Sequence, residues 1–144
     1  MAKKFVRLDN CAFTKVPSLI KSAKYMGTDG TTATAVENGV LVAVKGLIEN
    51  EREIHVAQDA VSEDTMIGVV CTPEVEYDER GYHGLDTFEN KSGDPIRVGL
   101  LQKGDIFSVG NETATTDLTA GTVTAKHIAT ETSGRFTYQV YEVQ

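Results

Sequence analysis

Four side chains of the kinds that ligate metals lie close together in this sequence. Asp78, Glu79, His83 and Asp86 fall within nine residues. Carboxylates and imidazole are ligands of divalent cations. Calcium loops, however, space their carboxylates at alternate positions around a tight glycine turn, and this run has a different register. We therefore expect a solvated acidic loop here, with no metal and no other cofactor.

The common catalytic signatures are missing from the sequence. The turn at residues 27–30 lacks the Lys-Ser/Thr ending of a phosphate-binding loop, and there is no G-x-S-x-G, H-E-x-x-H or C-x-x-C motif. Glu49, Glu51 and Glu53 alternate along one stretch, but their polar neighbours indicate exposure instead of the burial that would tune a general acid. The sequence therefore predicts a protein that is not an enzyme.

The length and composition are those of one soluble domain. The chain has 144 residues, 40% of them hydrophobic and 24% charged, and a formal net charge of −7. Its longest apolar run, residues 40–44, is far shorter than a membrane-spanning helix needs, and the N-terminus lacks a signal-peptide pattern. We expect a protein made and kept in a cytoplasm, with Cys11 and Cys71 as buried, reduced thiols.

Basic residues are concentrated at the N-terminus. Residues 1–26 hold six basic side chains and one acidic side chain, whereas the rest of the chain holds 8 basic and 20 acidic. This imbalance predicts a basic N-terminal arm at 1–26 before a single β-rich domain at 27–144. The arm is expected to contact an acidic partner or a sister copy, and the acidic body argues against nucleic acid. The contact residues predicted for the arm are Lys3, Lys4, Phe5, Arg7, Lys15, Lys21 and Lys24.

Short β-favouring runs separated by turns dominate the rest of the chain. Asn38-Gly39, between residues 34–37 and 40–44, predicts a β-hairpin. Further strands are predicted at residues 65–72, 96–101, 105–109, 121–126 and 135–143, and short helices at 17–25 and 56–62. Regularly spaced short strands are typical of a small β-barrel or sandwich.

The last predicted strand has a pattern that assigns its faces. Phe136, Tyr138 and Val140 alternate with polar side chains. Because successive side chains of a strand point to opposite faces, this alternation predicts that these three residues fill the core.

One long segment, residues 73–95, has no periodic pattern. Segments of this length in a compact domain are usually functional. We expect it to be a contact loop acting through Tyr77, Arg80, Tyr82 and His83, with Leu85 and Phe88 packed back onto the core.

The order of these pieces resembles a known group of proteins. The hairpin at residues 37–42, the strand at 68–70, the stretch from Leu85 to Val98 and the run Lys103-Gly104-Asp105-Ile106-Phe107-Ser108-Val109 together resemble the capsid decoration, or cement, proteins of tailed bacteriophages. The resemblance covers residues 30–110 and is strongest from Leu85 to Val109.

This resemblance implies a structural virion protein without catalysis. It implies a β-barrel or β-tulip body that binds the outside of the capsid and bridges subunits of the major capsid protein, often as a homo-oligomer such as a trimer. Its location would be the capsid exterior, after synthesis in the host cytoplasm. The alternative is a tail-tip or head-fibre-base module whose Tyr77, Asp78, Tyr82 and His83 line a cleft for a ligand or host receptor.

Overall fold

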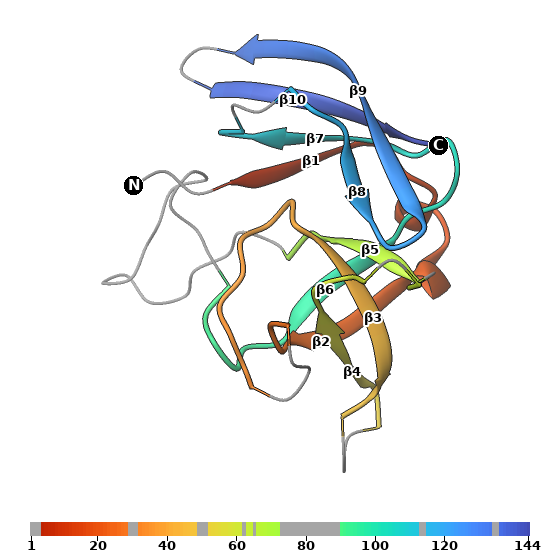
Figure 1. Ribbon diagram of the computed structural model, residues 1–144, viewed down its shortest axis with the longest axis vertical. Coiled ribbons are helices and arrows are strands. Elements are labelled where there is room, and N and C mark those ends of the chain that lie inside the picture. Colours follow the sequence, from red (N-terminus) through yellow and green to blue (C-terminus); the bar gives the residue numbers. More distant parts are fainter. Residues whose placement is uncertain are drawn as a thin grey trace.

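The computed structural model of the chain describes residues 4–28, 32–48, 52–61, 63–64, 66–72, 90–112, 115–133 and 136–144. Strands make up most of these residues, so the predicted mostly-β class is confirmed. Two groups of strands pack against each other (Figure 1). The elements in chain order are β1 (Phe5–Asn10), η1 (Ala12–Thr14), η2 (Pro17–Leu19), β2 (Ile20–Tyr25), β3 (Leu41–Leu47), β4 (Ile54–Gln58), β5 (Ile67–Val70), β6 (Ile96–Leu100), β7 (Ile106–Gly110), β8 (Leu118–Ala120), β9 (Val123–Ser133) and β10 (Phe136–Val143).

One group of strands is a closed barrel in the order β2-β4-β3-β5-β6. Strands β2 and β4 are parallel, and the other pairs are antiparallel. Val42 and Val44 of β3 fill the barrel with Val70 and Val98, while Ala43 packs on the opposite face of β3. The uninterrupted apolar run at residues 40–44 is explained by this arrangement, because a strand buried on both faces does not alternate.

The second group is an antiparallel sheet in the order β1-β7-β10-β9-β8. Its inner face packs on the barrel and closes a second core. The buried members of this core are Cys11, Phe13, Val69, Cys71, Leu101, Phe107, Val109, Ala125, Tyr141 and Val143. Since these residues come from both groups of strands, barrel and sheet share this second core.

The turn at residues 103–105 carries the chain from the barrel into the sheet. Asp105 is buried there, and its carboxylate accepts hydrogen bonds from the backbone N–H groups of Ala12 (3.0 Å) and Gln102 (2.8 Å). Gly104 has φ of +92°, a conformation that favours glycine. The Gly-Asp pair that contributes to the resemblance therefore has a structural role, because it holds η1 against the β6–β7 connection.

The expectation that residues 1–26 form an arm separate from the body is wrong. Residues 5–10 are β1, paired with β7, and residues 20–25 are β2, which closes the barrel between β4 and β6. Phe5 is 2% exposed and Ala23 is fully buried. The charge count missed this role because Arg7, Lys21 and Lys24 occupy only partly buried positions of strands that also carry the buried Phe5 and Ala23.

The predicted hairpin around Asn38-Gly39 does not form. Val36 instead pairs with Asn90 in an isolated bridge, and the Gly39 N–H donates to the Val70 carbonyl (2.8 Å). The buried Asn38 side chain donates to the Thr72 carbonyl (2.7 Å) and accepts from the Asn90 amide (3.0 Å). The Asn-Gly pair is thus a turn that ties distant segments together.

The predicted helices are largely wrong, and the predicted strands are largely right. Of residues 17–25, only Pro17–Leu19 form a short 3-10 turn, and residues 56–62 begin within β4. The β-branched Ile54 and Val56 pair with β2, and this tertiary pairing overrides local preference. Strands β5, β6, β7 and β10 lie where they were predicted, whereas β9 is longer than predicted and β8 was not predicted.

The predicted core face of the last strand is also wrong. Gln139, Tyr141 and Val143 face the shared core, and each is less than 5% exposed. Gln139 tolerates burial because its side chain accepts a hydrogen bond from Thr130 (2.7 Å) and donates to the Glu112 carbonyl (3.2 Å). Of the predicted core residues, Val140 is buried, while Phe136 and Tyr138 are half-buried on the outer face.

This assignment of faces predicts a definite order of stabilities. The Tyr141 ring is fully buried, and its hydroxyl finds no hydrogen-bond partner among the described residues. Tyr141→Phe should therefore leave the free energy of unfolding unchanged or raise it by about 1 kcal/mol. Tyr141→Ala should cost about 3–5 kcal/mol, and the half-buried Phe136→Ala clearly less. Urea denaturation measures all three, and a larger loss for Phe136→Ala would show that the faces are assigned incorrectly.

Candidate functional site

The side chains predicted for the arm have separate places in the fold. Lys4 enters a cleft, Phe5 is buried and Arg7 lies on the outer face of the sheet. Lys15 is exposed after η1, and Lys21 and Lys24 are partly exposed on the barrel strand β2. Lys3 lies outside the described residues. The described members of this set thus belong to the cleft, the outer face of the sheet, η1 and the barrel, and their predicted role in contacts stays a prediction.

Arg7 joins four strands across the outer face of the sheet. Its guanidinium contacts Asp9 (2.7 Å), Glu131 (2.5 Å) and the Ser108 hydroxyl (3.1 Å), and it lies 4.6 Å from the ring centroid of Tyr138. The hydrogen bond to Glu131, with a smaller contribution from Asp9, raises the pKa of Arg7. Because both carboxylates are already paired with it, Arg7 fixes β1 to its neighbours instead of offering a free cation.

Phe5 packs beside this ion-pair network. Its ring meets Phe136 and Tyr138 edge to face, with centroids 5.1 and 5.5 Å away. The ring covers Gly110, where an added Cβ would lie 2.3 Å from Phe5 Cζ, so only glycine fits below it. Phe5, predicted as a contact residue, is therefore an anchor of the edge strand.

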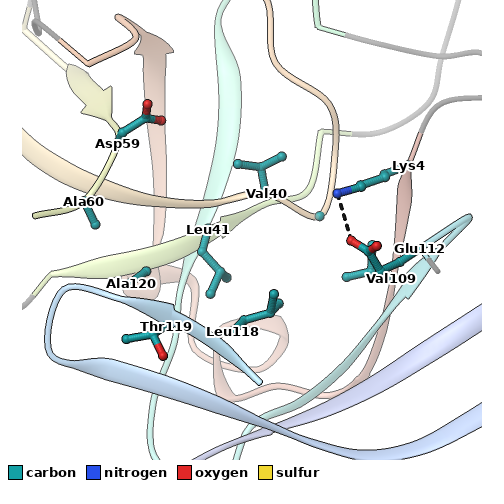
Figure 2. A pocket seen from close by; sticks show the side chains of 11 residues that line it. Lys4, Val40, Leu41, Asp59, Ala60, Val109, Glu112, Leu118, Thr119 and Ala120 are labelled. Carbon is teal, nitrogen blue, oxygen red and sulfur yellow. Dashed lines mark ion pairs between the residues drawn. The ribbon is translucent and has the colours of Figure 1, made fainter. Parts of the chain in front are cut away.

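A cleft of about 240 Å³ lies where the barrel meets the sheet. Figure 2 shows its walls, which come from the start of β3, the end of β4, the end of β7, β8 and the chain on either side of them. Six of the eleven lining residues carry apolar side chains. The lining residues are Lys4, Gly39, Val40, Leu41, Asp59, Ala60, Val109, Glu112, Leu118, Thr119 and Ala120.

Charged groups flank the cleft on opposite sides (Figure 2). On one side, Lys4 Nζ lies 2.8 Å from a carboxylate oxygen of Glu112, and the Lys4 backbone N–H donates to Glu37 (3.1 Å). On the other side, Asp59 accepts a hydrogen bond from the Tyr25 hydroxyl. Burial, together with Asp59, raises the pKa of Tyr25 to about 12, so this hydroxyl keeps its proton at neutral pH.

Asp59 also borders a second and more open hollow, of about 390 Å³. Its other lining residues are Tyr25, Met26, Gly27, Thr28, Thr32 and Thr34. Asp59 therefore lies between the two depressions, and Tyr25, which donates to it, lines the second.

Residues 90–95 of the predicted contact loop are described, while residues 73–89, including Leu85 and Phe88, lie outside the described residues. This applies to Tyr77, Arg80, Tyr82 and His83, and to the carboxylates Asp78, Glu79 and Asp86. Within the part of the chain that the structure describes, no group of three or more His, Cys, Asp or Glu side chains is arranged to hold a metal ion.

The described histidines and cysteines have structural partners. His55 Nδ1 lies 3.0 Å from the Lys45 carbonyl, and His127 Nε2 lies 2.7 Å from Gln139 Oε1. Cys11 and Cys71 are buried and form no disulfide, as predicted, and the Cys11 thiol donates to the Ile106 carbonyl (3.2 Å). Burial, with a contribution from nearby Asp105, raises the pKa of Cys11 to about 12. A thiol protonated at neutral pH is a poor nucleophile.

No protein-family model, curated protein or solved structure matches this chain. Among the described residues, no helix is long and apolar enough to cross a membrane.

The cleft between barrel and sheet is the candidate site, and sequence reasoning missed it because its walls come from segments far apart in the chain and follow no motif. Its two acidic residues, Asp59 and Glu112, are far apart in the sequence, and nothing there indicates that they lie in one site.

The Cys11 environment predicts how stability depends on pH. In the unfolded chain this thiol loses its proton near pH 9, whereas in the folded protein its pKa is about 12. Because the folded state holds the proton more tightly, stability should fall as the pH rises from about 9 towards about 12. In Cys11→Ala this alkaline slope should be smaller, and in the control Cys71→Ala it should persist. Equal slopes in both variants, measured by urea titration at each pH, would contradict the assignment.

Proposed function

We propose that this chain is a structural virion protein that binds the outer surface of a tailed-bacteriophage capsid and stabilises the lattice of the major capsid protein. It performs no catalysis in this role. The proposal begins from the resemblance of residues 30–110 to capsid decoration proteins. The strongest stretch of that resemblance ends in β6, the 103–105 turn and β7, which connect the barrel to the sheet.

The observation that carries the proposal is the use of charged groups to fasten strands together. Arg7 bridges β1 and β9, Lys4 pairs with Glu112 after β7, and Lys45 of β3 pairs with Asp64. The Lys45 ammonium, with the Val61 N–H, keeps the pKa of Asp64 below its usual value. A protein that holds a shell together needs such a fixed body and contact surface, and it does not need reactive groups.

The sheet also supplies surfaces suited to association. The barrel is closed, so the open strand edges of the described fold belong to β1 and β8 at the two ends of the sheet. Unpaired edges accept a further strand from another chain, through backbone hydrogen bonds. A shell protein in contact with either edge would be held without any chemical reaction.

The proposal is tested by adding the purified chain to heads of the phage that encodes it, from which the chain has been removed by deleting its gene. We expect saturable binding at a copy number in simple proportion to the major capsid protein, and a higher temperature of DNA release from decorated heads. Quantitative mass spectrometry of sedimented heads gives the copy number. A few copies per head would instead support the fibre-base alternative, and no binding would contradict the capsid proposal.

A further inference from the structure

The backbone of Thr119 faces the cleft with free hydrogen-bonding groups. Ala120 and Val123 are paired across a two-residue turn whose first residue, Gly121, has φ of +58°, as in a type II′ hairpin. In such a hairpin the residues that flank the turn exchange hydrogen bonds, and the next pair, Thr119 and Thr124, does not.

An independent contact supports this register. The Thr124 carbonyl accepts a hydrogen bond from the Gln144 N–H (2.9 Å), so the backbone of Thr124 is directed away from β8. The N–H and C=O of Thr119 must then point away from β9, towards the open edge of β8. Thr119 is exposed and lines the cleft, and its backbone has no hydrogen-bond partner among the described residues.

The size and lining of the cleft indicate what fits beside this edge. Its volume of about 240 Å³ is below that of typical sites for drug-sized molecules. Leu118 and Ala120 of β8 line the cleft together with Leu41. In a strand added to β8, the residues paired with Leu118 and Ala120 would have their side chains on the same face as these two. One apolar side chain of that strand would fill the space near Leu118.

The charge of the cleft favours a basic segment. The Lys4 ammonium is neutralised by Glu112, whereas Asp59 forms no ion pair among the described residues. The two sides together leave one uncompensated negative charge, and the whole chain carries −7. A Lys or Arg two residues from the apolar side chain would lie on the same face of the added strand, within reach of Asp59.

We propose that this cleft is a binding site for an extended peptide segment of the partner protein, which adds as a strand to the β8 edge at Thr119. The segment carries an apolar side chain with a basic side chain two positions away. The inference deepens the proposed function, and it rests on that function only in taking the segment from the capsid protein. A second copy of this acidic chain fits less well, because Asp59 would then meet a body of the same charge.

The first experiment uses the free protein and a short probe. The capped peptide Ac-Thr-Lys-Thr-Val-Thr-Lys-Thr-amide has valine at its centre and lysine two positions away on both sides, so it suits either strand direction. We expect saturable binding by isothermal titration calorimetry, with NMR shift changes at residues 118–120 and 59–60. Replacing both lysines of the peptide by Glu should weaken binding roughly tenfold. Methylating the backbone nitrogens of the two threonines next to the valine should have an effect of the same size.

Matched variants of the protein locate the site. Thr119→Pro removes the free N–H, and an edge strand tolerates proline at such a position. It should lose roughly tenfold in affinity for the probe, while Thr119→Val, which keeps the N–H, should bind like the original protein. Asp59→Asn should weaken binding more than Glu63→Gln, which removes an exposed charge outside the cleft. If Thr119→Pro fails to fold, the methylated peptide tests the same hydrogen bonds.

The outcomes separate this inference from the proposed function. Absence of probe binding, or equal affinity for the methylated and unmethylated peptides, would overturn the cleft as a strand-addition site even if the protein still decorates heads. Probe binding by a protein that does not decorate heads would refute the proposed function and the capsid as the source of the segment. Dissociation of a self-associated form by the probe, seen in sedimentation equilibrium, would overturn the choice of a separate partner in favour of a second copy.

Discussion

The apolar core shared by the barrel and the sheet is the interaction on which the rest of this structure depends. Val69 and Leu101 enter it from the barrel side, and Phe107 and Tyr141 enter it from the sheet. The inner face of the sheet is covered by the barrel, whereas the barrel also has an interior of its own, filled by residues such as Val42 and Val98. Phe13 is buried in this core, packed so closely over Gly99 that an added Cβ would come within 2.5 Å of its ring.

Local patterns predicted several of the strands but not their partners. The residues of β5, β6, β7 and β10 show β-favouring runs bounded by turns, and these runs form strands where expected. The Asn38-Gly39 pair looks like a hairpin locally, yet its bonds to Val70, Thr72 and Asn90 depend on segments more than thirty residues away. The face of β10 was misassigned because a polar residue, Gln139, occupies a buried position with its hydrogen bonds satisfied.

The same limit explains why the candidate site was not predicted. Basic residues near the N-terminus indicated an arm, but strand pairing places Phe5, Val6 and Leu8 in the sheet and Ala23 in the barrel. The cleft combines Lys4, Asp59, Glu112 and Thr119, which become neighbours only after the layers have packed. The free backbone of Thr119 follows from the register of one hairpin, and the composition of the chain does not predict it.

The most direct test of this account is native-state amide hydrogen exchange, because a shared core requires both layers to open together. The most protected amides of β5 and β6 in the barrel, and of β7 and β10 in the sheet, should exchange with the same free energy of opening and the same dependence on denaturant. That common value should equal the free energy of global unfolding. Exchange of the β7 and β10 amides at a clearly lower free energy, while the barrel stays protected, would contradict the claim that one core holds the molecule together.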